Sequence, residues 1–148
     1  MMNARQKYLA DLTKSSQKLV DAVGYYEGFD DEDSSPLLCA IALCFDGLIL
    51  YVVAQEDDSF ELRREDWRPD LRWTVVSLME RRPWSAAKGK PLLWSWMLLN
   101  QQGYFDGLQL EFSRNSEDRS VVVQLVAIGS EVKQREVGSR CSAIAFNQ

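Results

Sequence analysis

The residues best suited to recognition chemistry lie between positions 94 and 106. The group combines two tryptophans, three consecutive amides, a phenol and a carboxylate, namely Trp94, Trp96, Asn100, Gln101, Gln102, Tyr104 and Asp106. Tryptophans two positions apart share one face of a strand. The group predicts either a patch that reads shape and hydrogen bonds or, as the commoner use of such residues, a turn whose amides satisfy backbone groups.

The usual combinations of catalytic residues are missing from the sequence. There is no histidine, which excludes Ser-His-Asp and Cys-His arrangements and the common zinc sites. Lys90 follows a glycine but lacks the preceding loop and the hydroxyl residue of a phosphate-binding motif. We therefore expect a protein that is not an enzyme and uses no metal and no cofactor. In a weak enzyme, Asp106 or Glu111 would be the acid or base.

The charge of the chain is unevenly distributed. Residues 27–60 hold nine acidic side chains and no Lys or Arg, whereas residues 61–90 are net basic. The densest acidic positions are Asp30, Asp31, Glu32, Asp33, Glu56, Asp57 and Asp58, and the first four lack the spacing of an EF-hand. Such an acidic surface suits a basic protein partner. The net charge of −5 argues against binding to nucleic acid.

The elements that would position these residues begin with a helix over residues 4–23. Asn3 and Gln6 have the spacing of a capping box, and Gly24 is placed to end the helix. An apolar stripe follows at Leu9, Leu12, Leu19 and Val23. Residues 24–36 are expected to form a loop.

The rest of the chain predicts strands. Asp46-Gly47 separates two apolar runs, 37–45 and 48–54, and indicates a hairpin of two central strands with a type I′ turn. Further strands are expected at residues 60–64, 71–79, 107–113, 119–128, 131–137 and 141–146, with edge strands at 60–64 and 131–137 and a flexible basic connection at 85–91. We expect one domain, residues 1–148, of the α+β class, with the N-terminal helix packed on a mainly antiparallel sheet of about six to seven strands.

Cysteine content and hydropathy favour the cytoplasm. The three cysteines show no framework spacing, and Cys39 and Cys44 lie in an apolar run as small core residues. No apolar run reaches the roughly 18 residues that a membrane-spanning helix needs. The first 18 residues have no apolar core of a signal peptide, so we expect no membrane association.

The sequence resembles a family of small bacterial proteins of unknown function. The resemblance covers roughly residues 89–137, with the Asp46-Gly47 hairpin as a weaker second element. It rests on Trp94-x-Trp96, then Asn100-Gln101-Gln102-Gly103-Tyr104-x-Asp106, then alternating Leu108, Leu110 and Phe112. The resemblance implies a bacterial, cytoplasmic domain, carries over no catalytic residue, and includes an association with toxin-immunity loci.

Three functions remain open from the sequence. The first is a protein-interaction module, immunity-like or inhibitor-like, that binds a basic partner through the acidic stretch. The second is a small-molecule binding domain that uses the group between Trp94 and Asp106. The third is a structural domain whose tryptophans lie at a self-interface, so the chain is expected to be a monomer or a homodimer.

Overall fold

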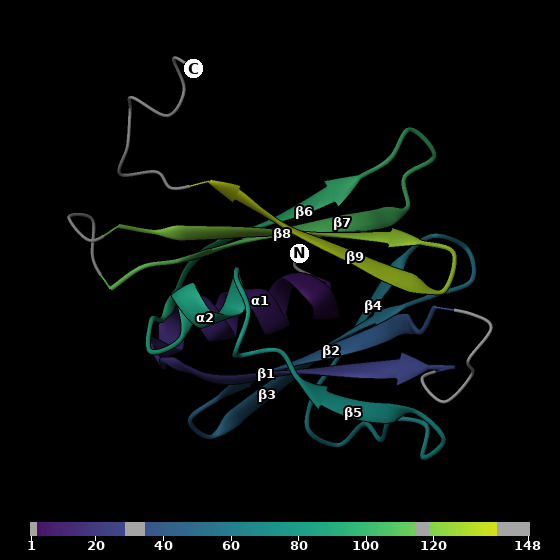
Figure 1. The fold of residues 1–148 in the computed structure, drawn as a ribbon. Coiled ribbons are helices and arrows are strands. Elements are labelled where there is room, and N and C mark those ends of the chain that lie inside the picture. The colour runs from purple at the N-terminus through teal and green to yellow at the C-terminus, as the bar shows by residue number, and fades with distance from the viewer. Residues whose placement is uncertain (1–2, 29–34, 115–118, 139–148) are drawn as a thin grey trace.

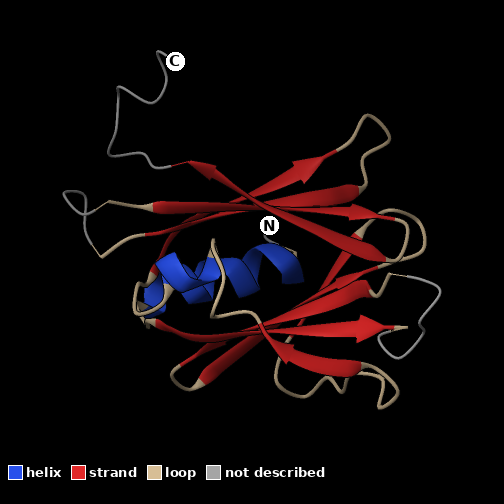
Figure 2. Ribbon diagram, in the orientation of Figure 1, coloured by secondary structure: helices blue, strands red, loops and turns tan. Residues whose placement is uncertain are grey.

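The computed structural model describes residues 3–28, 35–114 and 119–138. Within these ranges two antiparallel sheets face each other, and two helices lie between them (Figures 1 and 2). The first sheet has the order β4-β3-β2-β1-β5, from β1 (Leu19–Glu27), β2 (Leu37–Phe45), β3 (Leu48–Ala54), β4 (Phe60–Arg63) and β5 (Thr74–Ser77). The second has the order β6-β7-β8-β9, from β6 (Leu92–Leu99), β7 (Phe105–Phe112), β8 (Val121–Ile128) and β9 (Glu131–Gly138). The helices are α1 (Ala4–Ser15) and α2 (Trp84–Ala87).

The predicted α+β class with mainly antiparallel pairing is confirmed, but the prediction of one sheet with six to seven strands is wrong. The described residues form nine strands in two sheets. The two strands missing from the prediction are β1 and β6. Two layers are needed because β2 and β3 are buried on both faces, and one face of them is covered by the second sheet.

The start of the predicted N-terminal helix is confirmed, and its end is wrong. The Asn3 side chain accepts a hydrogen bond from the Gln6 amide, and the Gln6 side chain accepts one from the Asn3 amide. The helix ends at Ser15, because Ser16 takes a left-handed conformation with φ 56°. The residues from Leu19 onwards then pair with β2, so Gly24 lies within a strand.

The predicted hairpin and edge strands are largely confirmed. β2 and β3 pair through a two-residue turn, with Phe45 opposite Leu48. A type I′ turn would need positive φ at both turn residues, but only Gly47 has it, at 84°, so that assignment is wrong. β4 and β9 lie at sheet edges as predicted. The predicted strand at 141–146 lies outside the described residues.

The main core fills the space between the sheets. Phe60 of β4 and Phe105 of β7 meet edge to face at 5.8 Å between ring centroids. Trp84 packs on Phe112 in the same way at 6.3 Å, and its indole N–H donates to the Gln134 side chain of β9. The segment predicted as a flexible connection at 85–91 thus includes most of α2, which is fixed by a tryptophan only 1% exposed. Among the described residues, no helix has the length and apolarity to cross a membrane.

Candidate functional site

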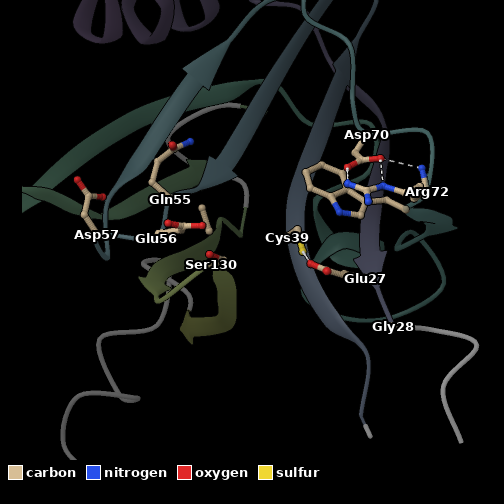
Figure 3. Close-up of a pocket in the computed structure, with 11 residues that line it drawn as sticks. Glu27, Gly28, Cys39, Gln55, Glu56, Asp57, Asp70, Arg72 and Ser130 are labelled. Atoms are coloured by element: carbon tan, nitrogen blue, oxygen red, sulfur yellow. Dashed lines mark hydrogen bonds and ion pairs between the residues drawn. The ribbon is translucent and has the colours of Figure 1, made fainter.

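An acidic cleft of about 750 Å³ lies at one end of the two sheets (Figure 3). Five segments that are distant in sequence form it: the end of β1, the start of β2, the β3–β4 turn, the connection between β4 and β5, and the β8–β9 turn. Its lining residues are Glu27, Gly28, Cys39, Ala54, Gln55, Glu56, Asp57, Asp70, Arg72, Trp73 and Ser130. We refer to this set as the acidic cleft.

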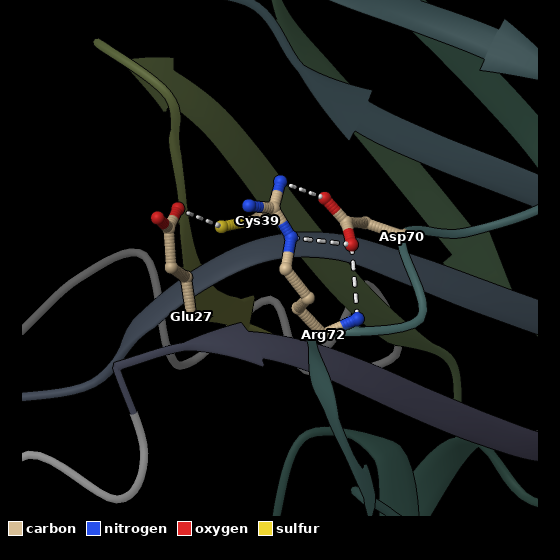
Figure 4. A network of polar contacts seen from close by, with 4 residues as sticks. All are labelled: Glu27, Cys39, Asp70 and Arg72. Carbon is tan, nitrogen blue, oxygen red and sulfur yellow. Dashed lines mark hydrogen bonds and ion pairs between the residues drawn. The ribbon is translucent and has the colours of Figure 1, made fainter.

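Among the residues that the structure describes, four carboxylates and one guanidinium determine the charge of the acidic cleft. Arg72 binds Asp70 through two parallel contacts, from Nε to Oδ1 at 3.1 Å and from Nη2 to Oδ2 at 2.8 Å (Figure 4). These hydrogen bonds lower the pKa of Asp70 to about 2, so its carboxylate stays ionised at any physiological pH. Glu27, Glu56 and Asp57 complete the set. The net charge of the lining residues is therefore negative.

Cys39 lies in the acidic cleft as an unreactive thiol. Cys39 is only 3% exposed, and its Sγ lies 3.8 Å from the Glu27 carboxylate (Figure 4). Burial, and next the negative charge of Glu27, raise the pKa of this thiol to about 11. Because the thiolate is the nucleophilic form, the group is protonated at neutral pH and does not supply a nucleophile.

The connection between β4 and β5 carries three residues of the acidic cleft. The two strands lie at opposite edges of the five-stranded sheet, so residues 64–73 must cross its outer face. Trp67 and Trp73 pack there against a second cluster of buried residues, Ala40, Ala42, Tyr51 and Val53. Four rings are in contact in a closed circuit: Tyr25 with Tyr51, Tyr51 with Trp67, Trp67 with Trp73, and Trp73 with Tyr25. We call these four side chains the aromatic cover.

Local hydrogen bonds fix the turn at the end of that connection. The Asp70 carboxylate accepts from the Arg72 amide at 2.9 Å, and the Asp70 carbonyl accepts from the Trp73 amide at 3.1 Å. An aspartate that bonds the amide two residues on is a common turn former. The turn holds Asp70, Arg72 and Trp73 toward the cleft and leaves the intervening Leu71 fully exposed.

The opposite wall of the acidic cleft joins the two sheets. The β3–β4 turn is closed by the Gln55 amide, which donates to the Ser59 carbonyl at 2.8 Å. The Asp58 carboxylate of this turn accepts a hydrogen bond from the Gly129 amide in the β8–β9 turn. Glu56 and Asp57 are thus carried on a turn anchored to the other sheet, next to Ser130.

The chain matches a known protein family over most of its length. The model described as "Family of unknown function (DUF6334)" matches residues 2–140. The chain belongs to this family. No curated protein and no solved structure matches it. Every residue of the acidic cleft lies within the span that the family model covers.

Only part of the acidic surface predicted from the sequence lines the acidic cleft. Glu56 and Asp57 line it, and Asp58 anchors the adjoining turn. The run Asp30, Asp31, Glu32 and Asp33 lies outside the described residues. Sequence reasoning missed Glu27, Asp70, Arg72 and Trp73. The Asp-x-Arg spacing at 70–72 is the signal that could have indicated a fixed turn there.

The group between Trp94 and Asp106 lies on the β6–β7 hairpin, and none of its residues lines the acidic cleft. Trp94 and Trp96 lie on β6, 54% and 40% exposed. The Asn100 side chain accepts from the Gln102 and Tyr104 amides at 2.9 and 3.0 Å, so this amide shapes the β6–β7 turn. Gln101 and Gln102 are exposed on that turn, as is Tyr104, and Asp106 is half-buried at the start of β7.

Cys44, expected in the core, is half-buried.

Proposed function

We propose that the chain is a protein-interaction module that binds a basic partner through the acidic cleft. The observation that carries the proposal is the charge of the lining: four carboxylates face one guanidinium, and that guanidinium is already paired with Asp70. Opposite charge speeds encounter and suppresses wrong partners. The volume of the cleft falls within the range of about 300–1,000 Å³ of ordinary ligand pockets.

Two features favour a protein side chain as the occupant. Trp73 offers an aromatic ring at the edge of the acidic cleft, and arginine and lysine bind such rings by cation–π attraction. Leu71 is fully exposed between two lining residues, where it supplies an apolar contact for a surface larger than a metabolite. A Lys or Arg side chain of a partner protein would contact the Trp73 ring, and the protein surface around that side chain would contact Leu71.

The biological setting that goes with this proposal comes from the resemblance described above. A bacterial origin, a cytoplasmic location and an immunity-like or inhibitor-like role all suit an acidic module that binds a protein. In that role the acidic cleft would bind a basic surface of the partner protein.

A charge-reversal experiment tests the proposal. Glu56→Lys, in the acidic cleft, is compared with Asp11→Lys, on the exposed face of α1. Both variants change the net charge by the same amount. The probe is a fluorescent deca-arginine peptide, with a neutral peptide of equal length as the blank, and fluorescence anisotropy measures the affinity.

The expected result follows from Coulomb's law. A unit charge roughly 5 Å away in a water-like medium contributes about 0.8 kcal/mol, so its reversal changes affinity about tenfold. We expect Glu56→Lys to weaken binding by that factor and Asp11→Lys by less than about threefold, because screening limits distant charges. Equal losses of affinity in the two variants, or no binding of the probe at low salt, would refute specific binding of a basic partner in the acidic cleft.

A further inference from the structure

The two sheets have four edges, and one of them differs from the others. Natural edge strands are kept from pairing by shortness and by charged side chains. β4 and β5 have only four residues each, and β9 carries Glu131, Lys133, Arg135 and Glu136. β6 has eight residues and no charged side chain.

β6 also exposes large apolar side chains along its length. They are Leu93, Trp94, Trp96 and Leu99, which are 36–63% exposed. On one side β6 pairs with β7, and in the described part of the chain its other side pairs with no strand, apart from a bridge between Lys18 and Pro91 just before it. The ladder to β7 is regular from Trp94 to Leu98.

Space for a further strand is present beside this edge. A groove of about 440 Å³ runs between α1 and β6, lined on the helix by Gln6, Leu9, Ala10 and Thr13 and on the strand by residues 94–97. Ala10 and Thr13 are small, so the backbone of an added strand can approach the edge. The groove is bounded by uncharged side chains throughout.

We propose that β6 pairs antiparallel with β6 of a second copy, about a two-fold axis at Trp96. Residues directly opposite each other in such a pair share a face. The axis therefore places Trp96 opposite Trp96 of the second copy, and Trp94 opposite Leu98, all on the outer face. On the inner face the small Ser95 lies opposite the long Met97. The regular segment 94–98 is thus complementary to itself in size on the inner face, and it carries no charge that would repel its copy.

Charge makes a second copy the best-fitting occupant of this edge. The chain carries a net charge of −5, so two copies repel each other on average. Residues 91–105 contain no Asp, Glu, Lys or Arg, and they form the one long edge free of that repulsion in the described structure. A basic or acidic partner would find no charge on β6 to recognise. The pairing is an isologous contact, which closes as a dimer.

The first test measures the mass of the full chain in solution by light scattering after size exclusion. We expect a particle of twice the chain mass of 17.0 kDa. Trp96→Lys, which introduces the charge used by natural edges, should raise the dimer dissociation constant at least about tenfold. Val75→Lys is the matched control, because Val75 is 60% exposed on β5, the edge of the other sheet. It should remain dimeric.

A monomeric parent chain, or equal dissociation in Trp96→Lys and Val75→Lys, overturns the proposal. Circular dichroism checks that each variant is folded. If Trp96→Lys does not fold, the more exposed Trp94→Lys replaces it, and a folded dimer of that variant with unchanged dissociation also overturns the proposal.

The second test fixes the register by oxidation. Chains with Ser95→Cys are mixed with chains with Met97→Cys, because these positions lie opposite each other across the proposed axis, within the Cα distance that a disulfide spans. We expect a covalent dimer in the mixture above the background given by the parent chain and its own three cysteines. Efficient crosslinking of Ser95→Cys alone, or none in the mixture, overturns the pairing about Trp96.

Discussion

Replacing Trp67 with alanine tests how the acidic cleft is held together. Trp67 does not line the cleft, but its ring lies 4.9 Å from that of Tyr51 and 6.4 Å from that of Trp73, between centroids. Without it, the connection between β4 and β5 loses an anchor on the outer face of the sheet. The change should therefore destabilise the fold and also loosen Asp70 and Trp73 in the acidic cleft.

The expected cost can be worked from burial. A tryptophan side chain covers roughly 150–250 Å², worth about 4–6 kcal/mol when fully buried at about 25 cal/mol per Å². Trp67 is half-buried, and a compact unfolded chain lowers the figure further, which leaves about 2–3 kcal/mol. The contact with Tyr51 adds about 0.5–1.5 kcal/mol. We expect about 3 kcal/mol in urea unfolding, and a drop of roughly 6–12 °C in Tm for a chain of this size.

Tyr25 provides an independent reading of the same change. Burial first, and then Tyr51 and Cys44, raise the pKa of Tyr25 to about 12, above its ordinary value near 10. Because the folded state favours the neutral phenol, the stability from this group is present below about pH 10 and is lost as the pH rises toward 12. In Trp67→Ala the pKa of Tyr25 should fall toward 10, and this loss of stability at alkaline pH should shrink.

The assay compares ultraviolet titration of tyrosinate in each background with and without Tyr25→Phe, so that the difference isolates Tyr25. Trp94→Ala is the control for the titration, because Trp94 is 54% exposed on the other sheet and its loss should leave the pKa of Tyr25 unchanged. If Trp67→Ala costs less than about 1 kcal/mol and leaves the pKa of Tyr25 unchanged, the aromatic cover does not hold the connection and the reasoning fails.

Two further predictions concern the second sheet. Trp84→Phe should cost about 2–3 kcal/mol, because it leaves a cavity and removes the donor that reaches Gln134 at 2.6 Å; urea unfolding measures it, and a cost below 0.5 kcal/mol would contradict the buried contact. A methyl group at Gly107 would lie 2.9 Å from Cβ of Leu98, so Gly107→Ala should cost about 1–3 kcal/mol. In Leu98→Ala, which removes Cδ1 at 2.9 Å but keeps Cβ, the same substitution should cost less, and a double-mutant cycle with no coupling would argue against this packing.

The elements predicted correctly from the sequence are those whose signals are local. Asn3 and Gln6 are three residues apart and cap a helix whatever the rest of the chain does. Asp46-Gly47 lies between two apolar runs, so the hairpin needs no distant contact to be recognised. The failure at β1 has the same cause, because apolar residues at 9, 12, 19 and 23 continue a helical spacing by coincidence, and only pairing with β2 makes a strand more favourable.

The acidic cleft could not be predicted because no stretch of sequence contains it. Glu27, Glu56, Asp70 and Ser130 come from four separate segments, and two different sheets bring them together. Their closeness depends on the crossing of residues 64–73 over the outer face. Trp67 and Trp73 do not form a repeating apolar pattern in the sequence, so the path of this connection could not be predicted from them. By contrast, the turn that includes Asn100, one of the two sequence interpretations of the group between Trp94 and Asp106, was accessible because it is local.

The topology keeps the two proposed surfaces apart, which makes them separable by experiment. The acidic cleft is built from strand ends and turns, and the four-stranded sheet contributes to it through Ser130 beside β9. β6 is the opposite edge of that sheet, with β7 and β8 between. A copy paired on β6 therefore leaves the cleft accessible, and a dimer would present two acidic clefts to a basic partner. Charge reversal at Glu56 should weaken the binding of that partner without dissociating the dimer. Trp96→Lys should dissociate the dimer and leave the affinity of a single cleft for the partner unchanged.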